Sequence, residues 1–187
     1  MTTTLLSQLR AVVPSRPLTL SEGLRLAELQ ATKLLAAHGI TRAPVPETAI
    51  TRIPRVRVTR ENRLPVSGAT HWSRGIWAIT VNADEPLTRQ LFTMAHEFKH
   101  ALDAPTADLL YPAVRDLTSA QRSEQVCDYF AACLLMPRHL VKRAVYNGTS
   151  DPDRLAAQFG VSRPAMRRRL QALGLVDRTQ RCLVGME

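Results

Sequence analysis

Long apolar runs, paired cysteines and flexible linkers are what this sequence of 187 residues lacks. Its densest apolar stretch, Tyr129 to Pro137, is less than half the roughly 20 residues that a membrane-spanning helix needs. The N-terminus has no charged start and no long apolar stretch, so we expect no signal peptide. The three cysteines, at 127, 133 and 182, form no Cys-x-x-Cys pair, which argues against a disulfide framework or a zinc knuckle. We therefore predict a cytoplasmic, reduced protein with no membrane partner.

Acidic residues are also few: 16 Asp and Glu stand against 25 Lys and Arg, for a formal net charge of +9. The charge is uneven. Counted in the same way, residues 1–40 carry +2, residues 41–74 carry +5, residues 75–136 carry −4 and residues 137–187 carry +6. Basic flanks are compatible with nucleic acid or an acidic partner, and equally with an ordinary solvated surface. The acidic middle indicates that a different chemistry lies there.

The hydrophobic periodicity predicts an α+β fold. We expect helices over residues 20–38, 87–102, 119–136, 139–146, 153–159 and 163–173, the first opened by a capping box of Thr19 and Glu22. Extended runs over residues 55–59, 66–72 and 75–82 predict a small antiparallel sheet. No linker divides the chain, so we expect a core over residues 1–137 and a C-terminal helical segment over residues 138–187 that packs on it.

The strongest motif is His96-Glu97-Phe98-Lys99-His100 within the helix expected over residues 87–102. Two histidines at i and i+4 lie one turn apart on one helix face, so both imidazoles can reach a single metal ion. Glu97 is rotated off that line, where it can act as a general base toward water. Lys99 occupies the other internal position, which can face away from the metal.

A third ligand is expected nearby, because a catalytic zinc usually has three protein ligands and one open position. Glu124 and Asp128 lie at i and i+4 of the following helix, and the small Ala131 and Ala132 allow that helix to approach closely. Glu124 can complete a His-His-Glu site. Asp128 can accept the free N–H of a ligand imidazole. One zinc ion per chain is predicted, although manganese or another divalent ion suits the same donors. Cys127 and Cys133 are expected to pack as small apolar residues.

With these motifs the sequence resembles the ImmA/IrrE family of metallo-endopeptidases. The resemblance is carried by Phe92-Thr-Met-Ala-His-Glu-Phe-Lys-His, by the segment from Glu124 to Pro137, by the strand-like Gly75–Asn82 and by the closing segment Leu155–Leu175. It runs from about residue 31 to residue 175. Two departures accompany it: Lys99 stands where glycine is common in the family, and no separate DNA-binding or sensor-like domain is visible, as in a short single-domain form.

The resemblance implies a zincin-like fold and a zinc-dependent peptidase. Carried over by motif position, His96, His100 and Glu124 are metal ligands, Glu97 is the catalytic base and Asp128 orients a ligand histidine. Such proteins typically cleave a helix-turn-helix transcriptional repressor, so we expect a protein substrate encoded near this gene and a role in derepressing stress-response or mobile-element genes. The residue that stabilises the oxyanion is left open. Tyr111 and His71 are candidates from their position near the motif, and the alternatives are a tyrosine packed in its loop and an exposed strand histidine. The substrate is expected to add to the sheet edge near residues 66–72.

Two other functions stay open at this stage. The spacing of a helix-turn-helix is met by Ala156, Gly160 and Met166, and Ser162 can cap the second helix. That helix carries Arg167, Arg168 and Arg169, where contacts to DNA are made. This makes a DNA-binding transcriptional regulator the main alternative. A non-catalytic scaffold that retains its zinc is the other.

Overall fold

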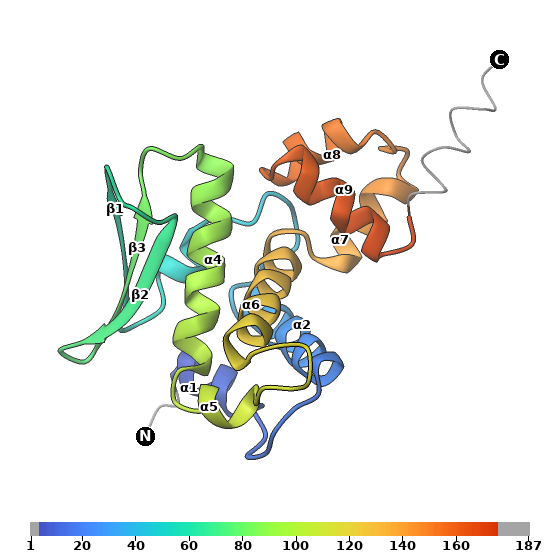
Figure 1. Cartoon of the computed structure of the whole chain (residues 1–187). Helices are drawn as coiled ribbons and strands as arrows, with labels where there is room; N and C mark the ends of the chain where they lie inside the picture. Colours follow the sequence, from blue (N-terminus) through green and yellow to red (C-terminus); the bar gives the residue numbers. More distant parts are fainter. Residues whose placement is uncertain (1–3, 176–187) are drawn as a thin grey trace.

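The computed structural model describes residues 4–175 (Figure 1). Its longer helices are close to the predicted ones: α2 spans Leu20–Ala37, α4 spans Leu87–Asp103 and α6 spans Ser119–Leu135. The later helices are α7 (Arg138–Tyr146), α8 (Pro152–Phe159) and α9 (Arg163–Ala172). The short helices are α1 (Leu5–Arg10), α3 (Thr48–Thr51) and α5 (Ala107–Leu110), of which α1 and α5 were not expected from the sequence.

The sheet is mixed, so the prediction of an antiparallel sheet is wrong. Strands β1 (Val56–Glu61), β2 (Gly68–Ser73) and β3 (Ile76–Asn82) lie in the order β1-β3-β2. β2 pairs with β3 antiparallel, whereas β1 pairs with β3 parallel. Because β3 lies between the two earlier strands, β1 pairs with β3 and not with β2, and β1 and β3 run in the same direction. Its residues alternate between buried and half-buried, while β2 is largely exposed. The most apolar strand therefore takes the centre and β2 becomes an edge strand.

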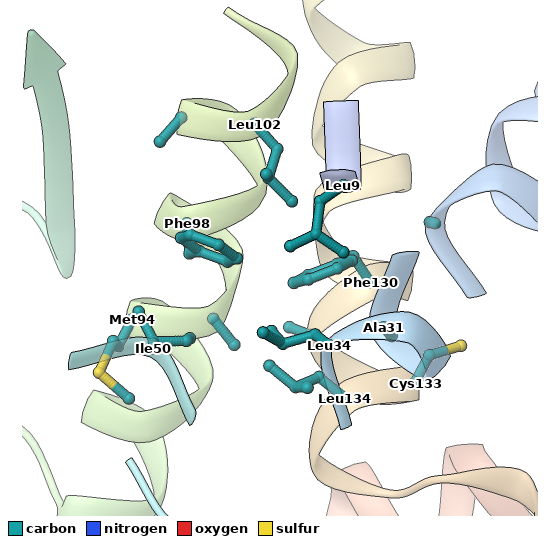
Figure 2. Packing of buried hydrophobic residues seen from close by; sticks show 14 of the residues in the cluster. Leu9, Ala31, Leu34, Ile50, Met94, Phe98, Leu102, Phe130, Cys133 and Leu134 are labelled. Atoms are coloured by element: carbon teal, nitrogen blue, oxygen red, sulfur yellow. The ribbon is translucent and has the colours of Figure 1, made fainter. Parts of the chain in front are cut away.

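The main core lies where α4 passes between the sheet and α6 (Figure 1). On α4, Ala95, Phe98 and Leu102 recur three or four residues apart and are all buried, and Phe98 lies close to Phe130 of α6. Figure 2 shows Leu34 of α2 and Leu9 of α1 in the same cluster. Because α4 is held by neighbours on two sides, the orientation of its remaining side chains is fixed.

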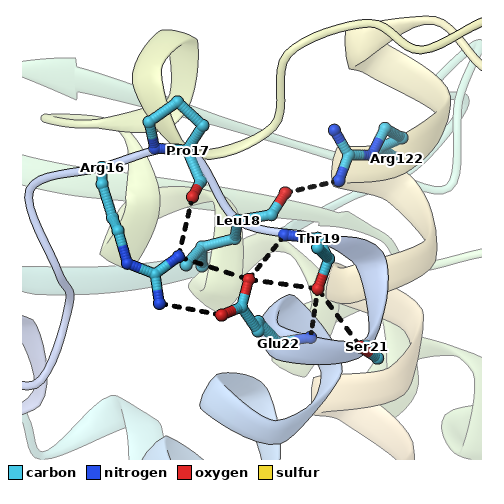
Figure 3. Close-up of polar contacts among 7 residues, drawn as sticks. All are labelled: Arg16, Pro17, Leu18, Thr19, Ser21, Glu22 and Arg122. Carbon is cyan, nitrogen blue, oxygen red and sulfur yellow. Dashed lines mark hydrogen bonds and ion pairs between the residues drawn. The ribbon is translucent and has the colours of Figure 1, made fainter.

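Hydrogen bonds hold the start of α2 in place and join it to α6. The predicted capping box is present at α2: the Glu22 amide donates to Thr19 Oγ1 at 3.2 Å, and the Thr19 amide donates to a Glu22 carboxylate oxygen at 2.8 Å (Figure 3). Arg16 donates to Glu22 at 2.8 Å. This bond, together with the bonds from the Thr19 amide and hydroxyl and the charge of Arg16, lowers the pKa of Glu22 to about 2. From α6, Arg122 donates to the Leu18 carbonyl at 2.6 Å and thereby joins the start of α2 to α6.

The buried apolar residues form two clusters. The first extends from Leu6 to Leu134 and the second from Leu135 to Leu175, so α7, α8 and α9 pack mainly around a core of their own. The predicted segment 138–187 continues beyond the described residues, and Cys182 lies outside them. No helix among residues 4–175 is both long and apolar enough to cross a bilayer.

Candidate metal centre

Three predicted ligands converge where α4 faces α6. Nε2 of His96 and Nε2 of His100 lie 3.1 Å apart. Each also lies near one oxygen of the Glu124 carboxylate, at 3.2 Å for His96 and 3.1 Å for His100. The helix spacing aligns the two histidines on α4, and the close packing of α6 brings Glu124 to them. The structure thus gathers two imidazole nitrogens and one carboxylate at a single point.

Asp128 lies one turn after Glu124 and holds the other side of the His96 ring. Its Oδ1 is 2.8 Å from Nδ1 of His96. Burial lowers the pKa of His96, but the bond to Asp128 and the charges of Glu124, Asp128 and Glu97 outweigh burial and raise the pKa overall. The carboxylate therefore favours a proton on Nδ1, and this leaves Nε2 directed at Glu124 and His100 with its lone pair available for a metal.

These donors fit a zinc ion. Bonds of about 2.0–2.1 Å in a tetrahedral arrangement separate two ligand atoms by roughly 3.3 Å, close to the separations found here. Cys127 offers another donor, since its sulfur and the two histidines have ligand atoms within 4.8 Å of one another. However, burial raises the pKa of the Cys127 thiol well above its ordinary value, which disfavours the thiolate that a metal requires. Glu124, whose two oxygens lie 3.1 and 3.2 Å from the imidazole nitrogens, is the better third ligand.

Glu97 lies beside this cluster without joining it. Burial raises the pKa of Glu97, the charge of Glu124 raises it further, and His96 opposes both. A carboxylate with a raised pKa is a stronger base, as a group that takes a proton from water needs to be. Gly68 of β2 packs against this part of α4: a Cβ built on it would lie 3.3 Å from Cγ of Glu97 and 2.4 Å from Cγ2 of Thr93. The glycine therefore lets the edge strand approach Glu97 closely.

A cleft of about 840 Å³ opens above these residues. One part of its lining is formed by His96, Glu97 and Glu124, and another by Ser67 and Gly68 where β2 begins. The opposite wall comes from α9 and the residues before it, and it includes Val161, Ala165 and Arg168. This wall was not predicted, because residues 161–172 come near the metal ligands only through the packing of α7, α8 and α9.

Lys99 faces away from the ligands, as expected for an internal position of the motif. It is fully buried and donates to both carboxylate oxygens of Asp103 at 2.6 and 2.5 Å. The Tyr111 hydroxyl donates to the same carboxylate at 2.7 Å. Tyr111 is therefore held inside the core, and His71 lies exposed on β2 outside the cleft lining. Neither residue is placed to stabilise an oxyanion, so both of these sequence-based candidates are wrong.

Comparison with known protein families identifies the family to which this chain belongs. The model of the Peptidase_M78 family, described as the IrrE N-terminal-like domain, matches residues 55–171, which is more than half of the chain. This chain belongs to the Peptidase_M78 family. The family is of the zinc-dependent protease type, in agreement with the donor set described above. The resemblance inferred from the sequence is confirmed.

A solved structure shares the fold of this Peptidase_M78 member. It is a Mycobacterium tuberculosis transcriptional regulator, with a TM-score of 0.63 and 15% sequence identity. The likeness covers 89% of this chain and 51% of that one, so this chain spans about half the length of the regulator. At this identity the likeness concerns the fold alone, and it confirms the α+β class. A search of curated proteins gave no match.

Proposed function

We propose that this chain is a zinc-dependent endopeptidase whose substrate is a helix-turn-helix transcriptional repressor encoded near its gene. Cleavage of that repressor would turn on stress-response or mobile-element genes. The observation that supports the reaction is the convergence of His96, His100 and Glu124. Of these, His96 and Glu124 line a cleft together with Glu97. Membership of a peptidase family supports the same class of reaction.

In this proposal each side chain has one task. His96, His100 and Glu124 hold the metal, and Asp128 fixes the orientation of the His96 ring. Zinc, when bound, polarises a peptide carbonyl and makes nearby water more acidic. Glu97 takes the proton from the attacking water on its carboxylate and then delivers it to the departing amine. Manganese or another divalent ion is accepted by the same donors and is an outcome of the metal analysis below.

The open edge of β2 is the proposed track for the peptide. The Asn82 amide donates to the Ser67 carbonyl at 2.8 Å, which assigns Ser67 to a bonded pair with β3. Pairing alternates along an antiparallel strand, so the backbone groups of Gly68 and Thr70 face the free edge. An extended substrate can pair with these groups beside Glu97. Thr70→Pro removes one edge amide without touching the ladder, and we expect it to raise KM while metal content stays unchanged. An unaltered KM would contradict this track.

The decisive test of the proposed function combines metal analysis with cleavage of the neighbouring repressor. We compare the wild type, Glu97→Gln and the control Glu61→Gln, which changes an exposed acid on β1 outside the cleft. We expect one divalent ion per chain in all three proteins, and cleavage by the wild type and the control only. Equal cleavage by Glu97→Gln would refute the role of Glu97. Metal in all three proteins without any cleavage would favour the zinc-containing scaffold.

DNA binding remains the second candidate, since α8 and α9 are joined as a helix-turn-helix through Gly160 in the left-handed conformation. The three arginines do not share one exposed face. Arg167 pairs with Asp153 at 3.5 Å, Arg168 lines the cleft, and Arg169 is buried and donates from Nε to the Met136 carbonyl at 3.0 Å. A DNA affinity that falls steeply with salt and is lost on replacing all three arginines would support this candidate.

A further inference from the structure

One face of α9 forms a wall of the catalytic cleft. Ala165, Arg168, Arg169 and Ala172 recur three or four residues apart along this helix, and all four line the cleft. That spacing places them on a single side of the helix. The turn before α9 adds Val161 and Ser162 to the same lining. The second helix of the helix-turn-helix therefore presents this face to the cleft, opposite the metal cluster.

Two cations on this wall, Arg168 and Arg169, have no protein anion in the part of the chain that the structure describes. Arg169 is buried and donates to the Met136 carbonyl, whereas Arg168 is exposed. Two other arginines of α9, Arg163 and Arg167, share one anion, because both lie 3.5 Å from the Asp153 carboxylate. Arg89, across the cleft on α4, lies 3.8 Å from Glu85 and donates to Ser67. Among residues 4–175, no hydrogen bond or ion pair engages the Arg168 side chain. A guanidinium that is exposed within a cleft and lacks a partner is a ready site for a carboxylate.

The cleft lining further restricts the chemical class of ligand that Arg168 can bind. The lining of the same cleft includes the apolar side chains of Ala132, Met136, Val161 and Ala165. The acids of the cleft, Glu97, Glu124 and Asp128, lie together at its metal end. A chain that enters with an apolar residue against this lining can place a neighbouring carboxylate at Arg168, away from the acids. A basic side chain at that position would be repelled by the positive charge of Arg168.

From this geometry we infer that Arg168 is a specificity-determining residue that binds an acidic side chain of the substrate, next to an apolar residue held between α6 and α9. The inference rests on the proposed peptidase function for the presence of a peptide in the cleft. It assigns α8 and α9 a role in peptide recognition. The class of ligand is an extended segment that carries Asp or Glu beside an apolar residue, a few residues from the bond to be cut.

The test measures binding, so that it does not depend on cleavage. Zinc-loaded full-length Glu97→Gln protein is titrated with fluorescein-labelled decapeptides of alanine and leucine, in which Glu, Gln or Lys occupies each position in turn. At one position we expect the Glu peptide to bind about fivefold to tenfold more tightly than the Gln peptide, as for a partly exposed charged hydrogen bond. Adding Arg168→Glu should remove this preference and favour Lys. Adding Arg167→Glu is the matched control and should leave the preference intact.

Two results of the peptide titration would overturn the inference. One is that no position prefers Glu to Gln. The other is that Arg167→Glu removes the preference as fully as Arg168→Glu, because the effect would then arise from the overall charge of α9. Selective binding of Glu peptides through Arg168, without cleavage of them by the wild type, would uphold this subsite and refute the peptidase function. Weakening of DNA binding by both substitutions, with no effect on peptides, would overturn the inference in favour of the DNA-binding candidate.

Discussion

The buried pair of Lys99 and Asp103 makes a quantitative prediction for Lys99→Met. Both side chains are almost fully excluded from solvent, at 0% and 2% exposed, and Lys99 supplies two of the three hydrogen bonds that the Asp103 carboxylate receives. Removal of the lysine leaves a buried carboxylate with Tyr111 alone as its donor. Breaking a buried pair in this way costs about 3–5 kcal/mol of unfolding free energy. For a chain of this size, the midpoint of thermal unfolding should fall by about 6–20 °C.

The assay is urea and thermal unfolding in EDTA, so that metal binding does not add to stability. Lys33→Met, on the exposed surface of α2, is the control and should change stability by less than about 0.5 kcal/mol. The double variant Lys99→Met/Asp103→Leu removes both charges and leaves only the Tyr111 hydroxyl without its acceptor, at a cost of about 1–3 kcal/mol. It should therefore be more stable than Lys99→Met alone. The reasoning fails if Lys99→Met costs less than about 1 kcal/mol, or if the double variant is the less stable of the two.

Four further predictions concern the site and the α2 cap. Asp128→Asn should weaken zinc binding about 10–100-fold in a competition assay with a chelating dye, because His96 loses its orienting carboxylate, and equal affinity would contradict that role. Cys127→Ala should keep one zinc per chain by elemental analysis; loss of the metal would show that the thiol is a ligand. Gly68→Ala should destabilise the protein by about 1–3 kcal/mol in urea, since its Cβ would lie 2.4 Å from an atom of α4, and an unchanged midpoint would disprove that contact. Glu22 should titrate at a pKa of about 2 by NMR, against an ordinary value of 4.5. Because the folded-state pKa is the lower one, its stabilising effect should be present above pH 4.5 and disappear as the pH falls from there toward 2, whereas Glu22→Gln should lack this pH dependence.

Much of this protein follows from local patterns in its sequence. The apolar stripe of α4 and the capping box at Thr19 and Glu22 depend on neighbours along one helix, so both could be predicted. The same holds for His96 and His100, because one helical turn separates them whatever the rest of the chain does. Glu124 was predictable as a candidate because a third ligand was needed and the following helix offered an acid.

The tertiary structure decided which segments meet. The sheet order depends on which of the three strands is buried most fully, and β3 takes the central position because one of its faces is buried. This order leaves the edge of β2 open beside Glu97. Lys99 and Tyr111 share Asp103 only because α4 and the segment after it fold together. Arg168 reaches the cleft because α9 packs through its own core onto the end of α6. The sequence of a helix determines on which of its faces a side chain lies. Which residues lie opposite it across the cleft is determined by packing between segments that are far apart in the sequence.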